Sequence, residues 1–418
     1  MGSTERVRLA AASMFFAGSL GACTSDLDCS VAAEKAWLRD YMADWYFWAG
    51  SAPNPEPDGF ATLQDYLQAL LFTGDGAVPA DRWSSIIDAV NFGDLFDRGQ
   101  VLGYGLFVNS QSLGYSVFVN SNIELDLPLQ ARFIEEQSPA ATAGLKRGDT
   151  IVSINGRPSA ELIAANDFAA LTPSKAGDTL ELVMDDGSGP ATYDLVAQTY
   201  TLTPVPVATV LPSANGIMVG YLVLSTFITP SNAALIQALA SIRSQGATEL
   251  IVDLRYNGGG LIDTATLLAS LIAGAGHAGQ VFARFTANAM HHTNDTRTLS
   301  APQAPAFPRV LVLTGPRSCS ASELVINGLR PFAEVVTLGG TTCGKPFAFN
   351  GDEHCGSVYD VVTSEVVNAL GEGQYYDGIA ATCPVDDDFN GPLGSPSEKL
   401  LAAALSYLDS GGSCPNAE

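Results

Sequence analysis

The fold is decided by residues 249–261, which read ELIVDLRYNGGGL. The apolar run from Glu249 to Leu254 has the length and the composition of a buried strand, and a glycine-rich turn follows it. Apolar residues then recur at helical spacing from Ile262 to Ala273. A buried strand that leads through a tight turn into a helix is typical of α/β proteins with parallel strands.

Segments on both sides of this stretch repeat the alternation of buried strands and helices. Met218–Phe227, Arg309–Thr314 and Val335–Leu338 have the pattern of strands, and Ala321–Leu329 has that of a helix. These elements predict an α/β core with layered helices and largely parallel strands.

The glycine-rich turn also has a chemical use. At a turn from strand to helix, backbone amides point outward without partners, so Gly258, Gly259 and Gly260 could hold an oxyanion. Turns of this kind also bind phosphate, but the chain has no GxxxxGK[ST] phrase and this turn does not satisfy GxGxxG. A nucleotide site is therefore not predicted.

One serine and one lysine are the strongest indication of function. Ser320 lies in RSCSASE (317–323), directly before the predicted helix, and Lys345 follows 25 positions later in TCGK (342–345). A serine hydroxyl attacks carbonyl groups only when a base takes its proton. The chain has four histidines, and they suggest no Ser/His/Asp order.

Lysine is the remaining candidate base. The chain has five lysines, and Lys345 lies among glycine and phenylalanine in an apolar context. The pKa of a lysine falls on burial, which leaves a neutral amine at working pH, whereas arginine stays charged. Ser320 has an alternative reading as a simple helix cap, because Ser320 and Glu323 have the spacing of a capping box.

The N-terminus has the pattern of an export signal. Arg6 and Arg8 precede a short apolar run from Leu9 to Leu20, which is too short to span a bilayer. The ending Leu-Gly-Ala-Cys at residues 20–23 resembles the bacterial lipobox, which implies lipidation of Cys23. Ordinary signal cleavage is the alternative. We expect an exported, lipid-anchored protein of the bacterial envelope that faces the periplasm. The residues after Cys23 lack the aspartate linked to inner-membrane retention, which favours the outer membrane.

Charge and cysteine content narrow the partners. A formal net charge of −24 makes nucleic acid and anionic membrane improbable partners, because phosphate backbones need clustered lysine and arginine. Six cysteines remain beside Cys23, an even number that favours disulfides in an oxidising compartment. A bridge from Cys343 to either Cys319 or Cys355 could brace the serine and the lysine. Nothing suggests a zinc site, and no metal or organic cofactor is expected.

The pattern of residue types changes along the chain, which predicts several domains. An aromatic stripe at helical spacing marks a small helical domain, and short β-like runs with glycine, asparagine and aspartate mark a β-rich one. The acidic run Asp386-Asp387-Asp388 is interpreted as a solvated turn rather than a metal site.

The predicted boundaries are 1–22 for the signal peptide, 23–98 for the helical domain, 99–204 for the β-rich domain, 205–410 for the α/β domain and 411–418 for a tail.

The β-rich stretch resembles a PDZ domain. The resemblance lies in SPAATAGLKRGD (138–149), followed by IVSING at residues 151–156. It implies that Gly103, Tyr104, Gly105 and Leu106 form the loop whose amides hold a peptide's terminal carboxylate, while the peptide adds as a strand to a sheet edge. A plain hairpin start is the alternative for this loop.

Three phrases together resemble the carboxyl-terminal processing (tail-specific) serine peptidases with an inserted PDZ domain: DLRYNGGG, SASE and GK. The resemblance implies a ClpP/crotonase-like catalytic core. It also implies that Ser320 is the nucleophile, Lys345 the general base, and the amides of Ala321 and Gly259 the oxyanion donors. The substrates would be proteins or peptides bound by their C-terminal tails.

The chain departs from the family pattern at the group that orients the lysine. Pro331 stands where some members have an acidic residue, and Phe349 where others have glutamine. Pro346 also departs from the usual Gly-Lys-Gly phrase. Glu323 is the remaining candidate for a third catalytic group. These departures leave a second hypothesis open, a catalytically inactive lipoprotein that binds peptides or other ligands on the same scaffold.

Overall fold

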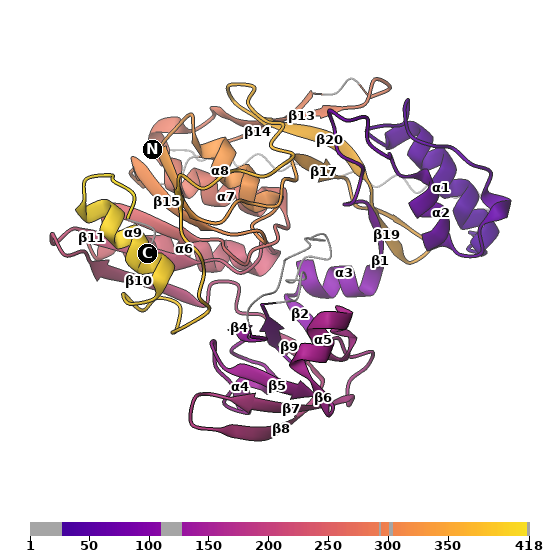
Figure 1. Cartoon of the computed structure of the whole chain (residues 1–418). Helices are drawn as coiled ribbons and strands as arrows, with labels where there is room; N and C mark the ends of the chain where they lie inside the picture. The colour runs from indigo at the N-terminus through magenta and orange to yellow at the C-terminus, as the bar shows by residue number, and fades with distance from the viewer. Residues whose placement is uncertain (1–26, 110–127, 292–293, 301–303, 416–418) are drawn as a thin grey trace, which may run out of the picture.

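The protein is described by a computed structural model that covers residues 27–109, 128–291, 294–300 and 304–415 (Figure 1). The predicted signal peptide and the predicted lipidation site Cys23 lie outside the described residues. Figure 1 shows an α/β core, a helical part next to it that carries α1 and α2, and a β-rich part that carries β5 to β8. Within the described residues, no helix has the length and apolarity that crossing a bilayer requires.

A mixed sheet forms the centre of the α/β core. Its strand order is β10-β11-β12-β15-β16-β21; β10 runs antiparallel to β11, and the other neighbours are parallel. The strands are β10 (Val207–Pro212), β11 (Met218–Val223), β12 (Glu249–Asp253), β15 (Arg309–Thr314), β16 (Glu334–Gly339) and β21 (Cys383–Pro384). The segments predicted as strands at 218–227, 309–314 and 335–338 and as a helix at 321–329 form these elements in the structure, and their ends agree within a few residues.

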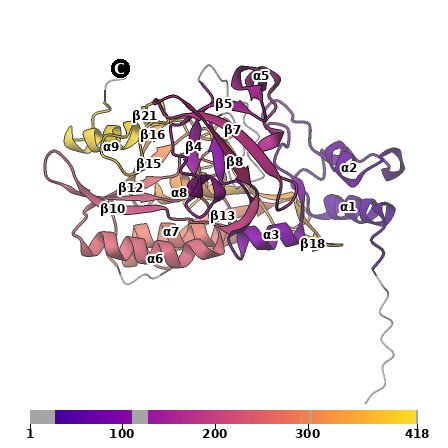
Figure 2. The same cartoon turned by 90° about the horizontal axis from the view of Figure 1, so that it is seen from below.

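Helices cover both faces of this sheet because its strands bury both rows of side chains. On β12, Leu250 and Val252 pack with one set of helices, whereas Ile251 points to the opposite face. The first face carries α6 (Thr229–Ser244), α7 (Ile262–Ala273) and α8 (Ala321–Leu329), and the second carries α9 (Lys399–Asp409). Figure 2 shows α6 and α7 on one side of the strands and α9 on the other. This three-layered core confirms the predicted fold class.

A second, antiparallel sheet extends the core toward the helical part. Its order is β14-β13-β20-β17, and β20 and β17 also contact the aromatic cluster of the N-terminal helices. The strands are β13 (Val281–Ala287), β14 (Asn294–Thr298), β17 (Phe347–Phe349) and β20 (Val362–Asn368). The sequence analysis did not predict this sheet, which carries one wall of the candidate site.

The helical part begins with α1 (Val31–Trp45), which Ser30 caps by accepting a hydrogen bond from the Ala33 amide. The aromatic stripe of α1 is core, as expected: Leu38, Tyr41 and Met42 pack against α2. The other elements are η1 (Pro57–Gly59), α2 (Leu63–Leu70), β1 (Ser85–Asp88) and α3 (Ala89–Phe96), and β1 joins β19 (Ser357–Asp360) and β18 (Asp352–His354) in a small sheet. The Cys29–Cys355 disulfide ties this part to the hairpin β18–β19.

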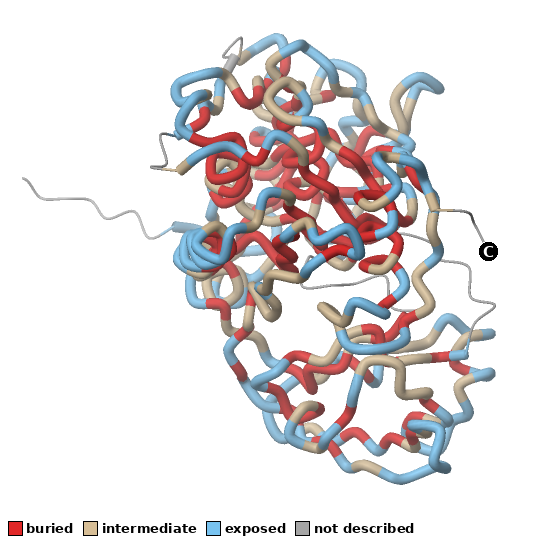
Figure 3. Tube along the Cα trace, turned by 90° about the vertical axis from the view of Figure 1, so that its left-hand side faces the viewer, coloured by how far each residue is buried: buried red, intermediate tan, exposed pale blue. Residues whose placement is uncertain are grey.

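The β-rich part, called the PDZ-like unit below, comprises the described residues between 100 and 201. It has its own buried cluster, which includes Leu106, Ile151 and Leu180, and Figure 3 shows this smaller set of buried residues apart from those of the α/β core. Its elements are β2 (Gln100–Gly103), β3 (Leu106–Val108), β4 (Ala131–Ile134), α4 (Pro139–Thr142), β5 (Thr150–Ile154), β6 (Arg157–Pro158), α5 (Ser159–Ala165), η2 (Ala169–Leu171), β7 (Thr179–Asp185), β8 (Pro190–Val196) and β9 (Gln198–Thr201).

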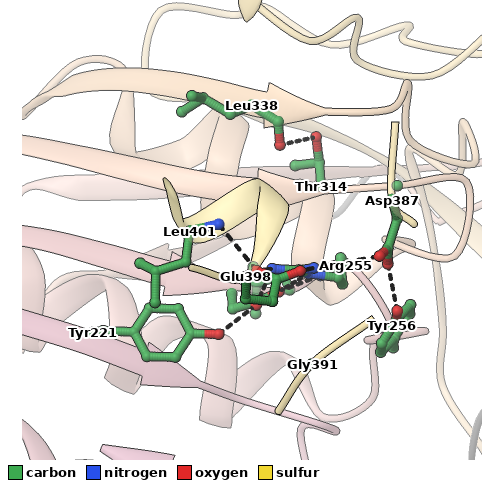
Figure 4. Close-up of polar contacts among 12 residues, drawn as sticks. Tyr221, Arg255, Tyr256, Thr314, Leu338, Asp387, Gly391, Glu398 and Leu401 are labelled. Atoms are coloured by element: carbon green, nitrogen blue, oxygen red, sulfur yellow. Dashed lines mark hydrogen bonds and ion pairs between the residues drawn. The ribbon is translucent and has the colours of Figure 1, made fainter. Parts of the chain in front are cut away.

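A buried polar network surrounds Arg255 in the core and includes Glu398 and Asp387 (Figure 4). Arg255, which follows β12, pairs with both oxygens of Glu398 at 2.5 and 2.9 Å and with Asp253 at 2.8 Å. Arg147 of the PDZ-like unit reaches the same network through Asp387 at 2.7 Å. The interpretation of residues 386–388 as a solvated turn is therefore wrong for Asp387, because two arginines hold its carboxylate in a largely buried position.

Candidate active site

The serine turn lies at the carboxyl ends of two neighbouring strands. Because β12 and β15 are parallel and adjacent, the segments that leave them, 254–261 and 315–320, meet at one edge of the sheet. The Cys319 amide donates to the Asn257 carbonyl at 3.1 Å and so fixes the two segments together. Ser320 is thereby placed directly at the start of α8, as the sequence predicts.

Ser320 has an unusual backbone conformation. Its φ of 54° and ψ of −113° lie in a region that residues with a side chain rarely adopt. Backbone strain of this kind costs about 1–3 kcal/mol and persists only where the surroundings enforce it, often at active sites. The Ser320 amide donates to Glu323 at 2.9 Å, as in a capping box, but the backbone of Ser320 is not extended as it is in an ordinary helix cap.

The glycine turn approaches the serine too closely for any side chain. A Cβ atom on Gly259 would lie 2.8 Å from the Ser320 Cβ and 2.9 Å from the Cys319 carbonyl oxygen, and Gly259 has a φ of +106°. Only glycine fits there. The glycine at 259 therefore allows the turn to lie against the nucleophile.

The predicted oxyanion donors differ in what they contact. The Gly259 amide donates to Asn257 Oδ1 at 2.8 Å, so in this structure it is already engaged. The neighbouring Gly260 lines the same cavity as Ser320 and Ala321, and its amide has no acceptor among the described residues. The oxyanion role of Gly259 and Ala321 stays a prediction, and the Gly260 amide is a further candidate donor in the same turn.

Lys345 is almost completely buried, with 2% of its surface exposed. Its Nζ lies 3.6 Å from the ring centroid of Phe349, and the side chain lines the same cavity as Ser320. Burial lowers the pKa of the Lys345 amine from its ordinary value of 10.5 to about 7, although nearby negative charges act in the opposite direction. An amine with this pKa is partly neutral at neutral pH and can accept a proton.

The cavity has a volume of about 250 Å³ and is lined mostly by apolar side chains. Its floor comes from α8 and from the second sheet, and α3 of the helical part contributes two phenylalanines. The apolar lining residues are Phe92, Phe96, Phe285, Leu324, Phe347, Ala348, Phe349 and Val366. Such a lining leaves room for an apolar side chain of a substrate.

Glu323, the predicted third group, connects the serine turn to the lysine segment. Its carboxylate accepts hydrogen bonds from the amides of Ser320, Gly344 and Lys345 at 2.8–2.9 Å, and from the Thr342 hydroxyl at 2.5 Å. Burial raises its pKa, while these hydrogen bonds oppose the change. Glu323 therefore acts on the backbone on both sides of the site and positions it.

A disulfide adds a covalent link at the same place. Cys319 and Cys343 are bonded to each other, which is one of the two alternatives left open by the sequence. The other alternative, Cys343 with Cys355, is wrong because Cys355 pairs with Cys29. The bond joins the residue before Ser320 to the residue two before Lys345, so it restrains the nucleophile and the base together.

The sequence analysis missed a second acidic group at the cavity, Asp360. It lies at the end of β19, is 4% exposed and lines the cavity with Lys345. Burial raises its pKa to about 7, opposed by the positive charge of Lys345. No local motif marks this residue, whose place at the cavity depends on the small sheet β1-β19-β18, in which β19 pairs with the distant strand β1.

The predicted peptide-binding loop lies at the start of the PDZ-like unit, between β2 and β3. The side chains of Tyr104 and Leu106 are buried in its core, so the backbone alone is left for binding a peptide there. Gly105 has a φ of +75°, and a Cβ at this position would lie 2.0 Å from the Ser138 Cβ. The loop geometry requires glycine at 105, and the binding role of residues 103–106 stays a prediction.

Fold and site together define an α/β peptidase-like core with an attached PDZ-like unit and a helical N-terminal part. Comparison with known families agrees in each part. Residues 218–368 match peptidase family S41, residues 33–85 match the N-terminal domain of S41 peptidases, and residues 134–183 match a PDZ domain. Each of the three parts of the structure is therefore similar to a known domain.

Individual relatives are carboxyl-terminal processing proteases. The chain is 28% identical over 244 residues to carboxy-terminal processing protease CtpA of Bacillus subtilis. The aligned residues make up 58% of this chain and 50% of the relative. It is 27% identical over 247 residues to the carboxyl-terminal-processing protease of a Picosynechococcus species. This alignment includes 59% of this chain and 55% of the relative. The chain thus spans about half the length of these relatives.

Solved structures show the same fold. The crystal structure of a Bacteroides fragilis protein assigned to the S41 proteases has a TM-score of 0.69 and 24% identity, covering 90% of this chain and 97% of the other. The photosystem II D1 C-terminal processing protease has a TM-score of 0.52 and 20% identity, covering 85% and 93%. At these identities the likeness concerns the fold.

Proposed function

We propose that the protein is a serine endopeptidase that uses Ser320 as nucleophile and Lys345 as general base. The observation that carries this proposal is the pairing of a strained serine at a helix N-terminus with a buried lysine in one apolar cavity. The names of the relatives, which are carboxyl-terminal processing proteases, support the same reaction class.

The reaction begins with proton transfer. Neutral Lys345 takes the hydroxyl proton of Ser320, and the serine oxygen bonds to the carbonyl carbon of the substrate peptide. The negative charge that develops on the carbonyl oxygen is held by backbone amides, and the candidate donors are those of Ala321 at the start of α8 and of Gly259 or the neighbouring Gly260 in the glycine turn. The positive end of the α8 dipole adds to this stabilisation.

The second half of the reaction returns the enzyme to its resting state. When the tetrahedral intermediate collapses, the carbon–nitrogen bond breaks, and the Lys345 ammonium gives its proton to the leaving amine. Water, deprotonated by the again neutral Lys345, then attacks the acyl-serine ester and releases the new carboxyl terminus. The proton passes from Lys345 back to Ser320. No external oxidant or reductant takes part.

Substrate selection is assigned to the PDZ-like unit. We expect the loop 103–106 to hold the terminal carboxylate of a protein tail through its amides, so that cleavage occurs toward the C-terminus. A peptide with a free C-terminus should then be cleaved faster than the same peptide with an amidated C-terminus. Equal rates for the two peptides would remove the tail-binding role. We expect the protein to act in the bacterial envelope, anchored through lipid on Cys23.

The nucleophile can be tested directly with a fluorophosphonate probe. The protein should be labelled once, on Ser320, and Ser320→Ala should abolish both labelling and hydrolysis of an unfolded protein substrate. Ser241→Ala, which changes an exposed serine on α6, is the matched control and should leave both unchanged. Hydrolysis that survives Ser320→Ala would contradict the proposed function.

A further inference from the structure

Three acidic side chains act electrostatically on Lys345, and they come from different elements. Glu323 lies on α8, Asp81 lies in the segment before β1, and Asp360 is the last residue of β19. Across the cavity lie two further charged groups, Asp263 of α7 and Arg297 of β14, which pair with each other at 3.4 Å near solvent. One of the three carboxylates must be the counter-charge of the Lys345 ammonium.

Two of the three carboxylates are already engaged in hydrogen bonds. Glu323 binds the backbone of the serine turn and of the lysine segment, as described above. Asp81 accepts hydrogen bonds from the Tyr46 hydroxyl at 2.7 Å, from the Ser84 hydroxyl at 2.6 Å and from the amides of Trp83 and Ser84. These contacts fix the local backbone and explain why both groups are buried.

Asp360 differs from both. Its side chain is buried and lines the cavity beside Lys345 and Ser320, yet among the described residues no group donates a hydrogen bond to its carboxylate. Its backbone is fixed independently, through pairing with Ser85 in β1. A buried carboxylate without hydrogen-bond donors is costly and is retained only where an opposite charge or a function compensates. The compensating charge here is that of Lys345.

We propose that Asp360 is the third group of the site, a positioning residue whose carboxylate is the counter-charge of Lys345 and controls when the amine is protonated. This inference rests on the proposed function for its role in catalysis. Asp360 takes the role of third group that the sequence analysis gave to Glu323. Glu323 instead holds the backbone of the serine turn and of the lysine segment together.

The arrangement suits a lysine that must gain and lose a proton in each cycle. When Lys345 takes the Ser320 proton, the ionised Asp360 carboxylate stabilises the ammonium without forming a bond to it that must break later. When the ammonium gives its proton to the leaving amine, the site returns to its first charge state. Because Lys345 and Asp360 both titrate near neutral pH, their protons come off as a coupled pair, and the charge of one sets the proton affinity of the other.

The pairing can be measured without any catalytic assay. The chain contains five lysines, so protein labelled with ¹³C at lysine Cε gives few signals, and the signal missing in Lys345→Arg identifies Lys345. Its chemical shift is then followed against pH. Removal of a nearby negative charge disfavours the ammonium, so Asp360→Asn should lower the titration midpoint by about one pH unit or more. An unchanged midpoint overturns the proposal.

Two variants separate charge from structure. Asp360→Glu keeps the charge and should keep the midpoint close to that of the unchanged protein, even if its longer side chain lowers stability. Glu353→Gln removes an exposed carboxylate from the same hairpin and should leave the midpoint unchanged. A shift of equal size in Glu353→Gln would show that general charge, not Asp360, controls the lysine and would overturn the proposal.

The same variant should change the pH dependence of hydrolysis. In Asp360→Asn the acidic limb of kcat/KM should move to lower pH together with the NMR midpoint, a change that loss of structure alone does not produce. The two proposals fail in different ways. Hydrolysis that survives Ser320→Ala would remove the proposed function, whereas the NMR midpoint decides on Asp360 in either case.

Discussion

Two sides of the cavity hold their catalytic groups by different means. On the serine side, the backbone is fixed by the hydrogen bond from the Ser320 amide to Glu323 and by the disulfide of Cys319. The same carboxylate and the same disulfide also hold the backbone of the lysine segment, through Gly344, Lys345 and Cys343. On the lysine side, the Lys345 side chain lies on an aromatic ring and lines the cavity together with Asp360, a carboxylate without hydrogen-bond donors in the described structure. The serine side fixes geometry, whereas the lysine side adjusts charge.

The difference follows from what each group must do. The nucleophile and the oxyanion donors must keep one arrangement through the reaction, and pre-organised hydrogen bonds provide it. The base must change its charge twice in each cycle, and a strong fixed hydrogen bond to one charge state would hinder that. Changes on the serine side should therefore alter geometry, and changes on the lysine side should alter pH dependence.

The largest effect is expected from removing the base. Lys345→Ala should lower kcat/KM by about 10²- to 10⁴-fold, and Lys345→Arg should do so as well because a guanidinium stays charged. Hydrolysis of an unfolded protein substrate measures the loss, and circular dichroism checks the fold. Lys175→Ala, an exposed lysine of the PDZ-like unit, is the control. Near-normal proteolysis by Lys345→Ala would rule out the assignment of the base.

A smaller loss is expected from the glycine turn. Gly259→Ala places a methyl group 2.8 Å from the Ser320 Cβ, so either the turn or the serine must move. The expected decrease in kcat is about 10²- to 10³-fold, the size typical of one lost oxyanion donor. Gly276→Ala is the matched control because a Cβ there meets no atom within 4 Å. Equal activity in both variants would show that the close approach has no catalytic importance.

The disulfides offer a matched pair. Replacing Cys319 and Cys343 by serine removes a link across 24 residues, and replacing Cys383 and Cys414 removes one across 31 residues. Because the loop lengths are similar, both double variants should lose about 3 kcal/mol of unfolding free energy. Activity at a temperature where both remain folded should fall about tenfold in the Cys319/Cys343 variant alone. Equal activity losses would mean that the site bond acts through stability only.

The sequence predicted the serine side better than the lysine side, and the reason is locality. The elements around Ser320, namely β12, α7, β15 and α8, each carry their own apolar pattern, so their place in the sheet follows from the sequence. The engagement of the Gly259 amide by Asn257 depends on a side-chain rotation that no pattern encodes.

The lysine side depends on contacts between distant segments. Asp360 reaches the cavity because β19 pairs with β1, and these strands are separated by more than 250 residues. Likewise, Asp387 is buried because Arg147 of the PDZ-like unit contacts it. A run of three aspartates predicts a solvent-exposed turn, because the sequence does not show which arginine pairs with one of them. Sequence patterns thus predict elements well and long-range charge pairs poorly.

The central claim is that burial makes Lys345 a base at neutral pH for Ser320, and the pH dependence of Ser320 labelling by a fluorophosphonate tests it most directly. Activity requires the neutral amine, so the labelling rate should rise about tenfold per pH unit below the pKa of Lys345 and level off above about 7. The rise should be absent in Lys345→Ala, whose residual labelling is slow. A rate in the unchanged protein that rises only near pH 10, or one that Lys345→Ala leaves intact, would contradict the account.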